Sequence, residues 1–150
     1  SYSFTSFITG IMPLTGILGS ILGGFAGDRF GIYRVGIVIM SLLAGLLFIF
    51  PSMSTVILAA GVYGLYRCLQ DSFIPILNGM ISGHSSSENR SLAFSFNFVI
   101  VNLLGSATTT GVSVFIENYG TPIIFPIAIG AILPVTVLIM VLQRLAKNSS

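Results

Sequence analysis

The chain has 150 residues, of which 54% are hydrophobic and only 7% are charged, whereas an average soluble domain carries about 25% charged residues. The mean hydropathy is +1.01, so polar side chains are too few to cover a water-facing surface. This composition excludes a soluble globular domain. The net charge of +2 is not gathered in a basic run, and we therefore expect no nucleic-acid partner.

The sequence contains few residues that could bind a metal or form a disulfide. Cys68 is the only cysteine and His84 the only histidine. A disulfide framework within the chain, a multi-thiolate metal site and a histidine-based zinc cluster are therefore excluded. We expect no metal and no cofactor.

Long stretches of the chain contain no Asp, Glu, Lys or Arg. They are residues 1–27, 35–66, 91–116 and 118–143. Each is long enough to cross a bilayer, which takes roughly 20 apolar residues as a helix. The sequence therefore predicts an all-α integral membrane protein.

Breakers and polar turns divide the chain into five predicted transmembrane helices within one domain, 1–150. In chain order, the helices are expected at about 4–26, 35–50, 55–80, 91–116 and 122–143. A polar loop, 27–34, follows the first helix, Pro51 stops the second, and a second polar loop, 82–90, follows the third. A turn beginning at Glu117 precedes the last helix, and a short polar tail is expected from Arg144.

The basic residues indicate an orientation in the membrane. With five spans, the loops 27–34 and 82–90 and the C-terminus lie on one side of the bilayer. That side carries Arg29, Arg34, Arg90, Arg144 and Lys147, and the other side carries no Lys or Arg. Because basic residues concentrate on the cytoplasmic side, we expect both loops and the C-terminus to be cytoplasmic.

Small residues recur at helical spacing in two of the predicted helices. The first helix has Gly16, Ser20, Gly24 and Asp28 four apart, with Gly19, Gly23 and Gly27 in an adjacent stripe. Membrane helices associate across such residues, so another helix should cover this face. The fourth helix has a polar stripe that includes Asn102, whose amide should face protein or a watery cavity, since it is costly in lipid.

The segment Gly24-Phe-Ala-Gly-Asp28-Arg29-Phe-Gly31-Ile-Tyr-Arg34 resembles the signature loop of the major facilitator superfamily, Gly-x-x-x-Asp-Arg-x-Gly-x-x-basic. Ile32 and Tyr33 depart from the basic residues usual after the second glycine. The resemblance implies a conformational-switch loop of Gly24, Asp28, Arg29, Gly31 and Arg34. In that loop Asp28 meets the positive end of a neighbouring helix, and Arg29 and Arg34 anchor the loop.

A second segment, Arg67-Cys-Leu-Gln70-Asp71, resembles the Arg-x-x-Gln-Gly motif of the fourth helix in that superfamily, with Asp71 in place of the glycine. An Arg inside a span is costly, so a function is the default hypothesis. Arg67 could bind an anionic solute or couple protons. Alternatively, Asp71 neutralises Arg67 within a scaffold, since the two are four residues apart. Gln70 and Asn102 are further candidates for lining a cavity.

The resemblance implies a partial transporter: five of the six helices of one half, which we expect to be the C-terminal half. Its partners would be a small-molecule solute, the lipid bilayer and the missing half, and its site the plasma membrane. Transport would proceed by rocking one half against the other. The alternative is a small helical subunit of a larger membrane complex with a purely structural role. We expect no enzyme, because Arg67 and Asp71 are the only charged residues within the predicted spans, and no Ser/His/Asp set, paired acids or metal ligands accompany them.

Overall fold

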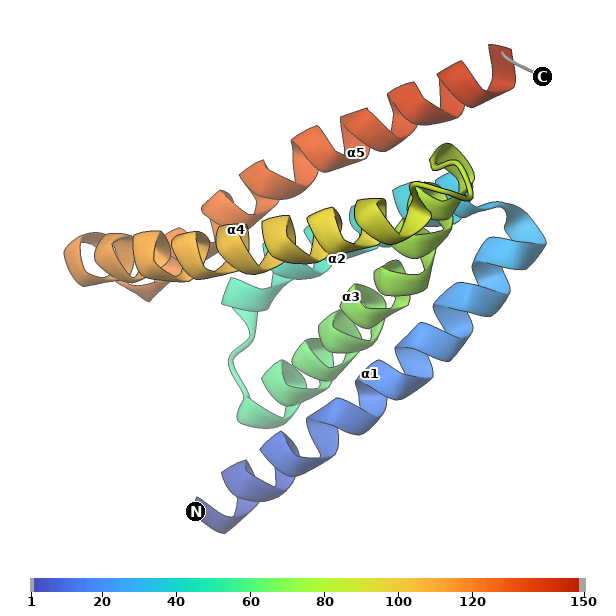
Figure 1. Ribbon diagram of the computed structural model, residues 1–150. Helices are drawn as coiled ribbons and strands as arrows, with labels where there is room; N and C mark the ends of the chain where they lie inside the picture. The colour runs from blue at the N-terminus through green and yellow to red at the C-terminus, as the bar shows by residue number, and fades with distance from the viewer. Residues whose placement is uncertain (1, 149–150) are drawn as a thin grey trace.

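The computed structural model describes the backbone of residues 2–148 and the side chains of residues 14–147. It contains five long helices: α1 (Tyr2–Phe30), α2 (Ile32–Ile49), α3 (Val56–His84), α4 (Arg90–Tyr119) and α5 (Ile124–Asn148). Two 3-10 turns, η1 (Phe50–Ser52) and η2 (Thr121–Ile123), follow α2 and α4. The described part of the chain has no strand, which confirms the all-α prediction (Figure 1).

The predicted loop 27–34 is wrong, because the helices on either side continue into it. Only Gly31 separates α1 from α2, and its φ of 90° and ψ of 132° break the helix. The Gly31 amide donates to the Gly27 carbonyl oxygen at 2.9 Å, and the Val35 amide donates to the Gly31 carbonyl oxygen at 3.1 Å. Helical hydrogen bonding therefore runs up to this residue from one side and starts again at it on the other.

Two further boundaries differ from the prediction for the same reason. The loop 82–90 shrinks to residues 85–89, and α5 continues through the expected tail to Asn148. The tail includes Arg144, Leu145, Ala146 and Lys147, which are strong helix formers. Polarity alone does not end a helix there. Residues 149–150 of the predicted tail lie outside the described residues.

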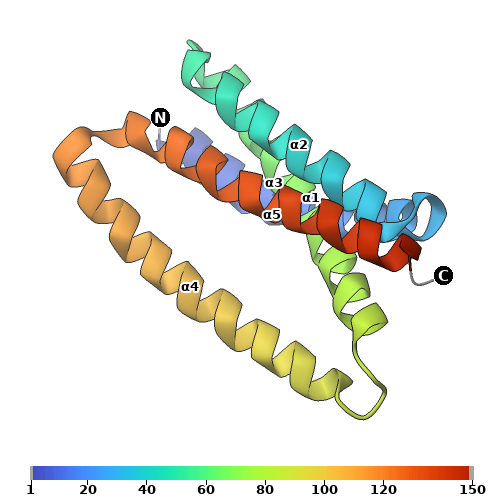
Figure 2. The same ribbon diagram turned by 90° about the horizontal axis from the view of Figure 1, so that it is seen from above.

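Consecutive helices run in opposite directions, so α1, α3 and α5 end at the same end of the molecule (Figure 1). The α1 helix packs along α3, and α2 packs against both α3 and α5. The core forms where these last three meet and consists of Ile39, Met40, Leu43, Ile76, Met80 and Ile139. The α4 helix diverges from this bundle and approaches it only near its two ends (Figure 2).

Three segments of the described chain are long and apolar enough to cross a membrane: Ile32–Ser52, Arg90–Tyr119 and Thr121–Lys147. They include α2, α4 and α5. This finding is compatible with an integral membrane protein.

The end of the molecule where α1, α3 and α5 finish is rich in cations, and we call it the basic end. It is formed by the last turns of α1 and α5, the first turns of α2 and α4, and residues 85–89. These segments carry Arg29, Arg34, Arg90, Arg144 and Lys147. The opposite end, formed by residues 50–55 and 120–123, has no Lys or Arg.

Candidate functional site

The α1 and α3 helices approach each other at backbone distance through the glycines of α1. A Cβ on Gly19 would overlap the carbonyl oxygen of Cys68, and a Cβ on Gly23 would overlap that of Ser72. The Ser72 hydroxyl lies 2.8 Å from the Gly19 carbonyl oxygen and 2.7 Å from that of Cys68, and it can donate to either. The helix that covers the small-residue face of α1 is therefore α3.

This close approach positions a polar cluster made by α3. The Arg67 guanidinium donates to Gln70 Oε1 at 3.1 Å and to Asp71 Oδ2 at 3.2 Å. The Asp71 side chain is 16% exposed and that of Arg67 is 36% exposed. Asp71 also lies against Gly16, where no side chain keeps it away from α1.

The cluster is closed on the Asp71 side and open on the Arg67 side. The Ser20 hydroxyl donates to the main-chain oxygen of Asp71 at 3.2 Å, which adds a second link between the two helices. Asp71 is held in this packed interface, and its carboxylate is the counter-charge to Arg67. The half-exposed guanidinium retains N–H groups that can meet an anion. The predicted alternatives for Arg67, solute contact and scaffold, therefore both remain predictions.

Four residues of the predicted switch, Asp28, Arg29, Gly31 and Arg34, lie at the corner between α1 and α2, and the fifth, Gly24, lies earlier in α1. Gly24 faces α3, and a Cβ there would contact the Pro75 side chain at 3.8 Å. Asp28, Arg29 and Arg34 are exposed, and the Arg29 guanidinium lies 5.6 Å from the centre of the Phe30 ring. Within the described residues, Asp28 has no hydrogen-bond or ion-pair partner.

Asn102 lies apart from the Arg67 cluster, in a cleft of about 820 Å³ between α3 and α4. The cleft is mainly apolar, with the amides of Asn78, Asn97 and Asn102 among its lining. The Asn102 amide donates to the Phe98 carbonyl oxygen at 2.7 Å, one turn earlier in its own helix. This bond within α4 satisfies one donor of the Asn102 amide without a partner from a second helix. The four predicted cavity residues therefore divide into a cluster of three and one residue elsewhere.

One pair of side chains was not predicted as a pair. His84 is expected in a solvated loop, but it ends α3, with Nδ1 2.9 Å from the Met80 carbonyl oxygen and Nε2 3.3 Å from the Tyr33 hydroxyl. With the proton on Nδ1, the ring donates to Met80 and accepts from Tyr33. This tautomer links the start of α2 to the end of α3. No sequence signal relates the two positions, because the link depends on how far each helix extends.

Metal-binding side chains do not gather anywhere in the described residues, since no group of three His, Cys, Asp or Glu side chains could hold an ion. Comparison with known proteins gives no match: no family model, no curated protein and no solved structure is significantly similar to this chain.

Proposed function

We propose that this chain is part of a secondary active transporter of the major facilitator kind, which moves a small solute by rocker-switch alternating access. The observation that carries the proposal is the corner at Gly31. It presents an exposed carboxylate, Asp28, without a partner among the described residues, on a corner that also carries the exposed side chains of Arg29 and Arg34.

The geometry of the corner suits a latch between two bundles. A one-residue reversal holds Asp28 close to the end of a rigid helix, where it can meet the positive N-terminus of a helix in a second bundle. Such a contact forms in one conformation and breaks in the other. A latch of this kind needs a carboxylate that is not already neutralised within its own bundle, and Asp28 meets that requirement.

In this proposal all five helices cross the bilayer, and the basic end is cytoplasmic. The α1 helix has no charged residue before Asp28, and the ion pair with Asp71 lowers the cost of Arg67 inside α3. The clustering of cations at one end supports this orientation, because cytoplasmic loops are enriched in Lys and Arg. The plasma membrane is the proposed site, and the second half of the transporter is the proposed partner.

The solute is proposed to meet the exposed side of the Arg67 guanidinium, which favours an organic anion. Gln70 holds that guanidinium from a second direction. The cleft lined by Asn102 is a second place where polar atoms face an open space. The proposal uses no metal, no cofactor and no covalent chemistry.

The test is an uptake screen in cells that express the full-length protein, with radiolabelled amino acids, sugars and organic anions. We expect accumulation of at least one class above vector controls, and Asp28→Asn should lower it at least tenfold. Glu88→Gln is the matched control, because Glu88 is an exposed carboxylate in the 85–89 loop at the same end. Equal uptake by wild type and Asp28→Asn contradicts the latch.

A structural subunit of a larger membrane complex is the second candidate, and α4 favours it. None of the 30 residues of this helix is buried, and most of them are exposed, so most of its surface is available to other chains. In that case Asp28→Asn changes no transport. Bulky substitutions along the polar stripe of α4, such as Ser106→Leu, then release the chain from its complex in mild detergent.

A further inference from the structure

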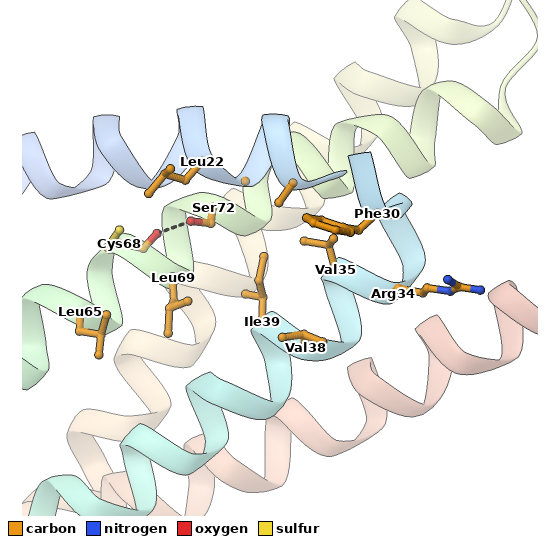
Figure 3. Close-up of a pocket in the computed structure, with 12 residues that line it drawn as sticks. Leu22, Phe30, Arg34, Val35, Val38, Ile39, Leu65, Cys68, Leu69 and Ser72 are labelled. Carbon is orange, nitrogen blue, oxygen red and sulfur yellow. Dashed lines mark hydrogen bonds between the residues drawn. The ribbon is translucent and has the colours of Figure 1, made fainter. Parts of the chain in front are cut away.

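A cavity of about 590 Å³ lies between α1, α2 and α3, on the side of α3 away from α4 (Figure 3). Its walls are side chains such as Leu22, Phe30, Val35, Val38 and Leu69, and they present almost no polar atoms. The hydroxyl of Ser72, which also lines it, is bonded to main-chain oxygens of α1 and α3. A polar solute therefore finds no partner in this cavity.

One cation stands at the end of this apolar space. The stem of Arg34 lines the cavity, and its guanidinium points out of it, away from Leu65 and Cys68 (Figure 3). Arg34 is exposed and has no ion-pair or hydrogen-bond partner in the described part of the chain. The chemistry thus changes along the helices, from apolar near Leu65 to cationic at the basic end.

We propose that this cavity binds one acyl chain of an anionic phospholipid, with the lipid phosphate on the Arg34 guanidinium. Arg binds phosphate with two parallel N–H donors, and the cation lies at the end of the bundle that holds most of the chain's other cations. From Leu22 to Phe30 the wall of α1 rises about 12 Å, so the space runs along the helices. A volume near 590 Å³ falls within the usual range of about 300–1,000 Å³ for ligand pockets.

An apolar cavity with a cation at one end favours an anionic lipid over other occupants. A second apolar helix would cover the walls but leave the guanidinium unmatched. A neutral lipid such as phosphatidylcholine carries its phosphate beside its own ammonium group, so it offers Arg34 less. The proposal requires a bilayer around the chain but does not require transport, so either proposal can fail without the other.

The test is native mass spectrometry of the full-length protein in detergent with equimolar phosphatidylglycerol and phosphatidylcholine. We expect wild type to retain one phosphatidylglycerol at least fivefold more often than one phosphatidylcholine. Arg34→Gln should abolish this preference. Arg90→Gln should keep the preference. This substitution removes the same charge from the same end of the molecule, but Arg90 begins α4 and does not line the cavity.

A second variant tests the cavity itself. Ala26 lines it and is half-buried, so Ala26→Phe should occupy the space and lower retention of both lipids at least fivefold. Equal retention of the two lipids by wild type overturns the proposal, whether or not any variant folds. An equal loss of preference in Arg34→Gln and Arg90→Gln, or an undiminished lipid adduct in Ala26→Phe, also overturns it.

Discussion

Gly31 alone determines the reversal between α1 and α2. Its φ of 90° lies where side chains are strained, while a Cβ there would meet no atom within 4 Å. The demand for glycine at this position therefore comes from the backbone and not from crowding. The sequence predicted a polar loop over 27–34, and the connection is shorter than predicted because residues 28–30 and 32–34 are all compatible with a helix.

We expect Gly31→Ala to destabilise the protein by about 1–3 kcal/mol, the usual cost of such a strained backbone conformation. Thermal unfolding in detergent, followed by circular dichroism, measures the change as a lower Tm. Gly45→Ala is the control, since Gly45 lies inside α2 with open space around it. A Tm as high for Gly31→Ala as for Gly45→Ala would show that another residue makes the turn.

Arg67 and Asp71 hold opposite charges in adjacent turns of α3, 3.2 Å apart. Removing one partner leaves an uncompensated charge, whereas neutralising both removes the problem. Asp71 is the less exposed of the two. Neutralising Asp71 destabilises the protein because it leaves the Arg67 guanidinium without a counter-charge. The spacing of four residues predicted this contact, but the part played by Gly16 in burying Asp71 depends on the α1–α3 register.

We expect Asp71→Asn to destabilise the protein by about 1–3 kcal/mol, with the half-exposure of Arg67 keeping the cost near the lower figure. The double variant Arg67→Gln/Asp71→Asn should recover most of this loss. Unfolding midpoints of wild type, both single variants and the double variant give the coupling energy. Additive losses would mean that the two side chains do not stabilise each other.

The pairing of α1 with α3 depends on which face of α1 carries glycine. Gly19 and Gly23 lie directly on the backbone of α3, whereas Gly24, one residue further, only touches Pro75. The repeat in the sequence predicted a covered face. It did not identify α3 as the partner, because a stripe of small residues is compatible with any helix of matching shape.

Gly23→Ala should lower the stability by about 1–3 kcal/mol, because its methyl group overlaps main-chain atoms of Ser72 and the helices must separate. Gly24→Ala adds the same methyl group at ordinary contact distance and should change the stability by less than about 0.5 kcal/mol. Thermal unfolding of the two variants side by side makes the comparison. Similar Tm values for both would contradict the backbone-distance contact.

The elements themselves were predicted better than their ends. All five helices occur in the predicted order, since apolar stretches and breakers identify helices well. The boundaries moved outward at residues 27–34, 82–90 and 144–148. In each place polar residues were interpreted as loop, but only Gly31 and residues 85–89 interrupt the helical hydrogen bonds.

For the whole molecule, the alternation of five helices brings the cations of distant segments to one end. The separation of α4 from the bundle was not predicted, because the pattern of its residues does not specify a partner. Its side-chain hydroxyls and amides bond to carbonyls of α4 itself, as at Thr109, Thr110, Ser113 and Asn118. The helix thus satisfies much of its own polarity.

We expect the basic end to face the cytoplasm. In a Cys68→Ser background, Ser86→Cys in the 85–89 loop should react with a membrane-impermeant maleimide only after permeabilisation. Ser54→Cys, which is exposed at the opposite end, should react in intact cells. The reverse pattern would place the Asp28 corner outside the cell and contradict the orientation.

The single residue between α1 and α2 also bears on how the protein is made. A longer loop would let the first helix settle in the membrane while the second was still being synthesised. With only Gly31 between them, the two helices are synthesised one directly after the other, with no intervening loop. If both helices cross the bilayer as proposed, the insertion machinery must accept them as a pair, and the charged residues around the corner stay on the cytoplasmic side.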